Sequence, residues 1–134
     1  MNLCSGYFQD KKTKDSQISL SHKLGRDAEN AAAAFLEGKG FVIIMRNYRA
    51  HRCEIDIVAR KAKTLIFVEV KSSDSGIPPE LMVNRRKIER LVRAANAFLA
   101  EKKIEEMDIR FDLIALRPDG GFWRINHIID AFRP

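Results

Sequence analysis

Two carboxylates of this sequence are predicted to face each other across a β-hairpin. Residues 53–60 and 65–71 are rich in β-branched and aromatic residues, which is typical of strands, and only residues 61–64 connect them. Either a two-residue or a four-residue loop gives a register that places Asp56 directly opposite Glu69. Opposed like charges destabilise a sheet, and burial increases the cost. Something must therefore compensate for this pair.

A divalent cation is the natural compensating group. Mg²⁺ binds a small number of carboxylate oxygens, keeps several waters, and can be completed by a substrate phosphate. Lys71 lies two residues beyond Glu69, on the same face of the strand. A lysine there can activate a metal-bound water or stabilise charge on a phosphoryl group. We therefore predict that Asp56 and Glu69 are metal ligands and that Lys71 takes part in hydrolysis.

A simpler interpretation of the same hairpin stays open. The register also places Glu54 opposite Lys71, which would make an ordinary cross-strand ion pair. A one-residue bulge in the hairpin would move Asp56 and Glu69 to different faces and remove the argument for a metal. The simple ion pair leaves the two opposed acids unexplained.

Glu29 is a third candidate acid. A helix is predicted from Ser21, a good N-cap, to the stop signal at Gly38 and Gly40. Helical spacing places Glu29 in line with Ala32, on the face turned toward the sheet. Glu29 therefore has either a role at the site or a position at the border of the apolar face, where it reaches solvent or an arginine.

The second predicted helix begins near Asn84 and carries cations in its first turn. Cations there oppose the helix dipole unless an anion binds, and a phosphate would resolve the conflict. Three of the arginines form one stripe that could follow a nucleic-acid backbone, although such a stripe is often only a solvated face. Lys87 is turned further inward than the others. The predicted nucleic-acid-binding residues are Arg85, Arg86, Lys87, Arg90 and Arg93.

The remaining patterns complete an α/β domain. The order is helix, three strands, helix, two strands, which predicts a central mixed sheet of about five strands flanked by two helices. Residues 1–20 lack periodicity and are predicted to be a flexible extension, with one domain over residues 21–134. The five strands are expected at residues 41–49, 53–60, 65–71, 109–116 and 122–129.

Composition narrows the class of protein. The chain has 134 residues and a formal charge of +6, which favours polyanionic partners. It has no apolar run long enough for a membrane span and no signal-peptide pattern, so we expect a cytoplasmic protein that does not enter membranes. Its two cysteines lack ligand spacing and are expected to be free thiols. No phosphate-binding loop, serine-hydrolase elbow or zinc motif is present, and the histidines are given no role.

Five motifs together resemble the bacterial UPF0102 family, also called YraN, of endonuclease-like proteins. The resemblance covers nearly everything from Leu24 to the carboxyl terminus. The motifs, in order, are Gly25-Arg26-Asp27-Ala28-Glu29, Arg46-Asn47-Tyr48-Arg49, Cys53-Glu54-Ile55-Asp56-Ile57-Val58-Ala59, Phe67-Val68-Glu69-Val70-Lys71 and Arg110-Phe111-Asp112.

This resemblance implies a restriction-endonuclease-like fold, similar to archaeal Holliday junction resolvases, with a metal held by Asp56 and the Glu69-x-Lys71 motif. Glu29 matches the helical acid of the resolvase-like group, and dimers are common among such proteins, so a homodimer is compatible with it. Two departures stand out. The family usually has glycine at the position of Cys53, and a basic residue soon after the motif lysine, where this chain has Ser72-Ser73-Asp74.

Two functions from different classes follow. The favoured one is an endonuclease that uses Mg²⁺ or Mn²⁺ to hydrolyse phosphodiesters of DNA, branched or single-stranded. The alternative is a non-catalytic nucleic-acid-binding or adaptor protein that keeps the fold and the basic helix.

Overall fold

The computed structural model describes the backbone of residues 2–9 and 20–133 and the side chains of residues 24–133. A six-stranded sheet forms the centre, in the spatial order β1-β6-β5-β4-β3-β2. Only β4 and β5 are parallel, and the other neighbours are antiparallel, so the sheet is mixed. The elements are β1 (Asn2–Gln9), α1 (Leu20–Gly38), β2 (Val42–Ala50), β3 (Cys53–Lys61), β4 (Thr64–Ser72), the 3-10 helix η1 (Pro79–Met82), α2 (Arg85–Glu101), β5 (Asp108–Asp119) and β6 (Phe122–Ile129).

The predicted α/β fold with a mixed sheet and two helices is confirmed, and all five predicted strands are present. The prediction of a flexible extension over residues 1–20 is wrong for residues 2–9, which pair antiparallel with β6 as an additional edge strand. Residues 1 and 10–19 of that predicted extension lie outside the described residues, and Leu20 is the first residue of α1. The short helix η1 lies between β4 and α2, with Pro79 as its first residue.

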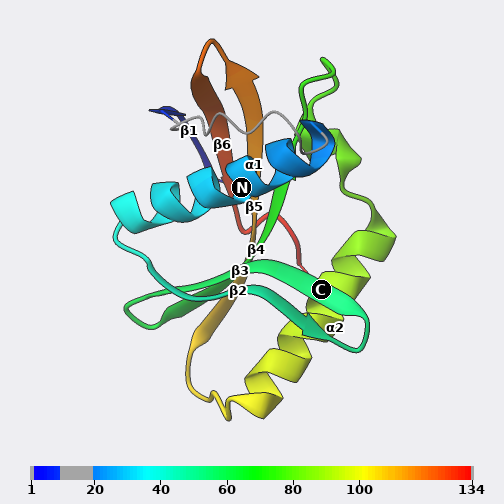
Figure 1. Cartoon of the computed structure of the whole chain (residues 1–134). Helices are drawn as coiled ribbons and strands as arrows, with labels where there is room; N and C mark the ends of the chain where they lie inside the picture. The colour runs from blue at the N-terminus through cyan, green and yellow to red at the C-terminus, as the bar shows by residue number, and fades with distance from the viewer. Residues whose placement is uncertain (1, 10–19, 134) are drawn as a thin grey trace.

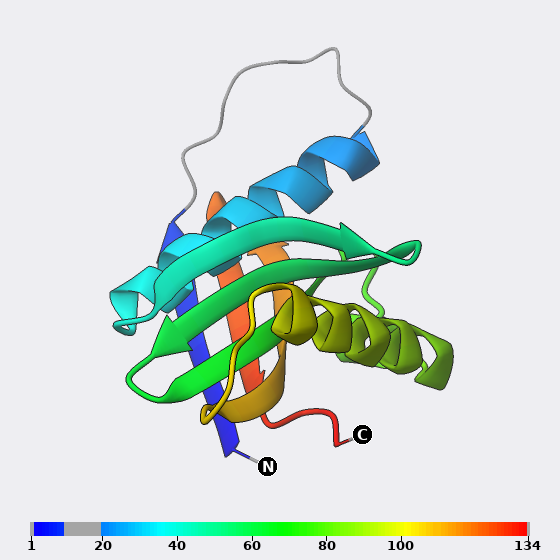
Figure 2. The same cartoon turned by 90° about the horizontal axis from the view of Figure 1, so that it is seen from below.

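Two apolar layers hold the helices against opposite faces of the sheet (Figure 2). Alternate residues of β4 divide between them because successive side chains of a strand point to opposite faces. Ile66 and Val68 pack in the layer with Ala32 and Leu36 of α1, whereas Phe67 packs in the layer with Leu91 and Phe98 of α2. None of the helices in the described part of the chain is long and apolar enough to cross a membrane.

Local signals in the sequence set several boundaries. The side-chain oxygen of Asn84 accepts a hydrogen bond from the backbone N–H of Lys87 at 2.9 Å, so Asn84 caps α2 as predicted. Gly40, with φ +92°, follows the end of α1. Gly120 and Gly121 both have positive φ and form the two-residue turn between β5 and β6.

The β3–β4 hairpin has the predicted register, but its pairing stops early. A two-residue turn pairs Lys61 with Thr64, and the ladder continues to the pair Ile57–Val68. Beyond that pair β4 stays alongside β5 as far as Ser72. In Figure 1, β2 and β3 run across the direction of β5 and β6. The strands β3 and β4 therefore separate just where Asp56 and Glu69 occur.

Candidate active site between the diverging strands

Asp56 and Glu69 occupy the first positions after the β3–β4 ladder ends. One carboxylate oxygen of Asp56, Oδ2, accepts a hydrogen bond from the backbone N–H of Val70 at 2.8 Å. A side chain thus takes the place of the strand carbonyl that a continuing ladder would have offered to this N–H. The two acids are held on neighbouring strands by the register that the sequence predicted.

Two lysines approach Glu69 from different elements. Glu69 is only 4% exposed, and its Oε1 lies 3.6 Å from the Nζ atom of Lys71 and 3.3 Å from that of Lys87. Lys71 follows on β4, as expected for alternate residues of a strand. Lys87 comes from the first turn of α2, and its predicted inward position is confirmed by this contact.

The electrostatics of the site favour a proton on Asp56 or a bound cation. Burial and then the charge of Glu69 raise the pKa of Asp56 to about 8, although the hydrogen bond from the Val70 N–H opposes them. At neutral pH the metal-free pair therefore holds a proton. Burial lowers the pKa of Lys71, and although Glu69 opposes this, the charge of Lys87 adds to the lowering. Burial lowers the pKa of Lys87, but the attraction of Glu69, the hydrogen bonds with Lys71 and Glu69 and the charge of Asp56 together outweigh it, so the pKa is raised.

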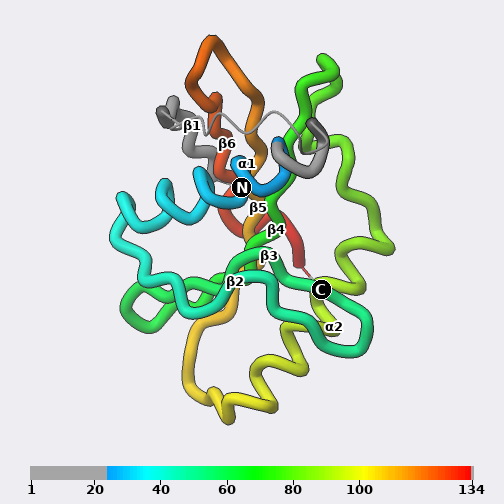
Figure 3. The backbone as a smooth tube through the Cα atoms, viewed as in Figure 1, coloured from blue at the N-terminus to red at the C-terminus, as the bar shows by residue number. Residues whose placement is uncertain are grey.

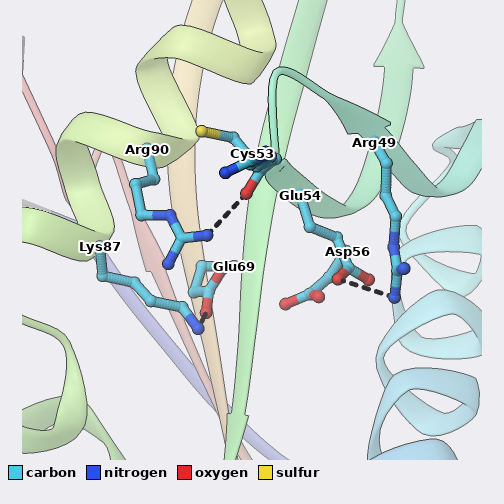
Figure 4. A pocket seen from close by; sticks show the side chains of 8 residues that line it. Arg49, Cys53, Glu54, Asp56, Glu69, Lys87 and Arg90 are labelled. Carbon is cyan, nitrogen blue, oxygen red and sulfur yellow. Dashed lines mark hydrogen bonds and ion pairs between the residues drawn. The ribbon is translucent and has the colours of Figure 1, made fainter.

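An open pocket of about 340 Å³ gives access to the two acids. In Figure 4, Lys87 and Arg90 approach from α2 on one side and Arg49 approaches from β2 on the other. The acidic side chains lie between these cations. The complete lining consists of Arg49, Arg52, Cys53, Glu54, Asp56, Glu69, Lys87 and Arg90.

Glu29 reaches the border of this site from α1. It is half-buried on the same helix face as the fully buried Ala32, as its spacing predicted. Burial raises its pKa, with nearby Arg46 opposing, and the charges of Glu54 and Glu69 raise it further. The negative charge of Glu69 therefore acts on Glu29, although Glu29 is not among the residues that line the pocket.

Glu54 and Lys71 each pair with another residue and not with one another. Glu54 Oε2 lies 3.5 Å from Arg49 Nη2, and Lys71 Nζ lies 3.6 Å from Glu69 Oε1. The bulge that would have moved Asp56 and Glu69 to different faces is not found along the described β3–β4 ladder. The register shift occurs instead between β2 and β3, near Ile43 and Met45.

The other predicted cations lie on the exposed side of α2. Arg85 pairs with Glu89 at 3.5 Å, and Arg86 and Arg93 are exposed. Arg90 differs from them because its guanidinium donates a hydrogen bond to the backbone carbonyl of Arg52 at 2.6 Å. It thereby joins α2 to the β2–β3 turn at the rim of the pocket.

Several residues around the pocket were not predicted as site residues. Arg49 and Arg52 belong to the β2–β3 hairpin, where Arg49 pairs with Glu54 across the ladder. Cys53, a free thiol as predicted, is buried and donates to the carbonyl of His51 at 3.4 Å. The side chain of Cys4 lies outside the described side chains.

A second polar cluster, which the sequence analysis did not assign, lies inside the α1 layer. Asp112 is fully buried and receives two hydrogen bonds of 2.9 Å from Arg110. His127 is also fully buried, with Nε2 2.8 Å from Asp112 Oδ2 and Nδ1 3.1 Å from Lys39 Nζ. Charged Lys39 donates to Nδ1, which places the imidazole hydrogen on Nε2, facing Asp112. This cluster is enclosed by the core and serves the fold.

The donor set at Asp56 and Glu69 fits a Mg²⁺-type ion better than zinc. Among the described side chains, no three His, Cys, Asp or Glu residues converge to form a complete metal site. Two carboxylates are nevertheless a sufficient protein contribution for Mg²⁺, which retains waters and is completed by substrate oxygens. The raised pKa of Asp56 supports this fit, because a cation would take the place of the proton.

Comparison with known proteins places the chain in a family. The profile described as "Uncharacterised protein family UPF0102" matches residues 28–116, which include both acids and Lys71. The chain belongs to the UPF0102 family. A UPF0102 protein of Desulforapulum autotrophicum is 44% identical over 114 residues, covering 83% of this chain and 93% of the relative. A UPF0102 protein of Bacteroides thetaiotaomicron is 43% identical over 115 residues, covering 84% and 94%.

Proposed function

We propose that this UPF0102 protein is a metal-dependent nuclease that hydrolyses phosphodiester bonds of DNA. The observation that carries the proposal is the pair of neighbouring carboxylates, Asp56 and Glu69, which both line an accessible pocket, with Lys71 3.6 Å from Glu69. A structural ion pair would not require a second acid, Asp56, whose pKa burial and the charge of Glu69 raise to about 8. A hydrolytic site would, because the acids must be close enough to share one cation.

Each residue has a distinct role in this proposal. Asp56 and Glu69 would hold Mg²⁺ or Mn²⁺, which supplies a Lewis acid and lowers the pKa of bound water. Lys71, whose pKa is lowered, can accept a proton from the attacking water or orient it. Lys87 keeps its charge and faces the same pocket, so it can stabilise negative charge on the phosphoryl oxygens. Glu29 would support the site from α1 by its negative field.

The basic rim favours a polyanionic substrate. Arg49, Arg52 and Arg90 surround the opening of the pocket, and the exposed face of α2 adds Arg86 and Arg93. Such residues bind phosphates without reading base sequence. The resemblance to resolvases makes branched or single-stranded DNA the first substrates to test. It also leaves a homodimer and a cytoplasmic location as proposals.

Cleavage assays with charge-removing variants test the proposal. Branched, single-stranded and duplex DNA are incubated with Mg²⁺, Mn²⁺ or EDTA, using the wild type, Glu69→Gln and Lys71→Met. We expect cleavage only with a divalent cation and a loss of about 100-fold or more in each variant, in line with the loss of a group that acts on the reacting atoms. Glu105→Gln, on an exposed loop after α2, is the matched control and retains wild-type cleavage.

Two outcomes would contradict this function. Cleavage that survives both Glu69→Gln and Lys71→Met would place the chemistry elsewhere or in a contaminant. Absence of cleavage on every substrate, with DNA binding that is unchanged by Glu69→Gln, would favour the non-catalytic nucleic-acid-binding or adaptor protein.

A further inference from the structure

Asn47 has a backbone conformation that few residues other than glycine adopt. Its φ is +53°, in the left-handed region, although it lies within β2. The β2–β3 ladder pairs Arg46 with Ile57 and Tyr48 with Ile55, and it leaves the position between them, Asn47 opposite Asp56, unpaired. The strand is therefore irregular at the residue that faces the proposed metal ligand.

The side chain of Asn47 lies between two carboxylates. A carbonyl oxygen in that position would be repelled by both acids, so hydrogen bonding assigns the amide nitrogen to it. In this orientation the nitrogen donates to Glu29 Oε2 at 3.2 Å and to Glu54 Oε1 at 3.1 Å. The two hydrogens of one amide group thus serve acids from two different elements, α1 and β3.

The amide group of Asn47 offsets the repulsion between Glu29 and Glu54. Glu29 and Glu54 carry like charges and both add to the field at Asp56. Each also has an arginine nearby, Arg46 for Glu29 and Arg49 for Glu54, which would draw the two acids apart if nothing joined them. A neutral group with two donors can join them without neutralising either one. The left-handed backbone of Asn47 is what directs its side chain to that point.

We propose that Asn47 is a positioning residue that ties Glu29 of α1 to Glu54 of β3 and fixes both beside the Asp56–Glu69 pair. The inference rests on the proposed function for its catalytic consequence, but the clamp itself is a property of the metal-free fold. This proposal also makes Glu54 a residue of the site, whereas the sequence analysis gave it only as a possible ion-pair partner of Lys71. It also accounts for how an acid on a helix outside the pocket keeps a defined position relative to the ligands.

Two substitutions separate the clamp from the backbone conformation. Glycine accepts positive φ freely, and aspartate accepts it about as well as asparagine, so Asn47→Gly and Asn47→Asp both preserve the backbone. Neither can donate to the two acids, and Asn47→Asp adds a third negative charge. Asn96→Asp, on the exposed side of α2, makes the same chemical change away from the site and is the matched control.

The first measurement is the thermal midpoint with EDTA and with Mn²⁺. We expect the midpoint in EDTA to fall in both variants and furthest in Asn47→Asp, and Mn²⁺ to recover more of the loss in Asn47→Asp than in Asn47→Gly. Asn96→Asp should follow the wild type in both conditions. If both variants at position 47 match the wild type in EDTA, Asn47 serves only the backbone and the proposal is overturned, whether or not the protein cuts DNA.

The second measurement is cleavage kinetics with Mg²⁺. We expect kcat to fall about tenfold or more in both variants, while KM for DNA changes less than twofold, because the substrate-facing cations are untouched. Equal losses in kcat and DNA affinity would assign Asn47 to substrate binding and overturn the positioning role. If the wild type cuts no DNA, the proposed function fails, and the thermal measurement still decides whether the clamp exists.

Discussion

Replacing Asp56 with asparagine should stabilise the metal-free protein at neutral pH. In the folded state the pKa of Asp56 is about 8, because of burial and then the charge of Glu69, whereas its ordinary value is 3.8. The folded chain therefore keeps a proton at this site over a pH range in which the unfolded chain has lost it. Stability must then fall as pH rises from about 4 to about 8. Asparagine, which cannot ionise, removes this dependence and still offers an oxygen to the Val70 N–H.

The size of the effect follows from the pH interval. Each unit between the two pKa values corresponds to ~1.36 kcal/mol of unfolding free energy. At pH 7, roughly three units above the ordinary value, Asp56→Asn should be more stable than the wild type by about 4 kcal/mol. Below about pH 3 the difference should vanish, because both the folded and unfolded wild type are then largely protonated at this residue.

Urea unfolding in EDTA at pH 5 and pH 7 tests this reasoning. The stability difference between Asp56→Asn and the wild type should grow by about 3 kcal/mol over those two units. Asp108→Asn, an exposed carboxylate at the start of β5, controls for the loss of a negative charge and should show no such growth. A difference that is equal at the two pH values, or a variant less stable than the wild type at pH 7, would refute the proton-sharing pair.

Two further predictions concern the acidic pair and the buried cluster around Asp112. Mg²⁺ binding, measured by titration calorimetry, should strengthen about tenfold from pH 6 to pH 7 and release close to one proton, since the cation replaces the proton of the acidic pair; a pH-independent affinity would argue against Asp56 as a ligand. Asp112→Asn should cost about 2–4 kcal/mol of unfolding free energy, because it weakens the buried bonds to Arg110 and His127. Although burial opposes it, hydrogen bonds from His127, Arg110 and the Asp130 N–H hold the pKa of Asp112 below its ordinary value, so this stability is present at neutral pH and lost as pH falls below about 4. In urea unfolding at a series of acidic pH values, the unfolding free energy of the variant should fall less steeply with decreasing pH than that of the wild type.

The hairpin carrying the acids could be predicted because its geometry leaves little freedom. A strand has a period of two residues, and a short connection fixes the register, so the position of Asp56 opposite Glu69 followed from spacing alone. The faces of α1 and α2 followed in the same way from helical period, which placed Glu29 toward the sheet and turned Lys87 further inward than the other cations of α2. These are local relations within one helix or one hairpin.

Other parts depend on relations that residue patterns did not supply. Residues 2–9 contain asparagine, serine, glycine and glutamine and have no clear apolar period, yet the open edge of β6 offers them a backbone partner. Arg49 is set opposite Glu54 by the β2–β3 ladder, and Arg52 lies in the turn that joins the two strands, a hairpin that the sequence analysis did not relate to the acids. The pairing of Asp112 with His127 was accessible in principle, since the turn at Gly120–Gly121 sets Ile114 opposite His127 and leaves Asp112 two residues away on the same face.

The divergence of β3 from β4 is the structural event on which the candidate site depends. While the ladder continues, every inward side chain is packed, and no oxygen is free to meet a ligand. Where it ends, Val70 requires an acceptor, and Asp56 supplies it with one oxygen while the residue also lines the pocket. Asp56 therefore satisfies the last backbone donor of the diverging strands and also forms part of the pocket. Loss of the carboxyl group, as in Asp56→Ala, would combine a folding defect with any catalytic one, whereas asparagine separates the two.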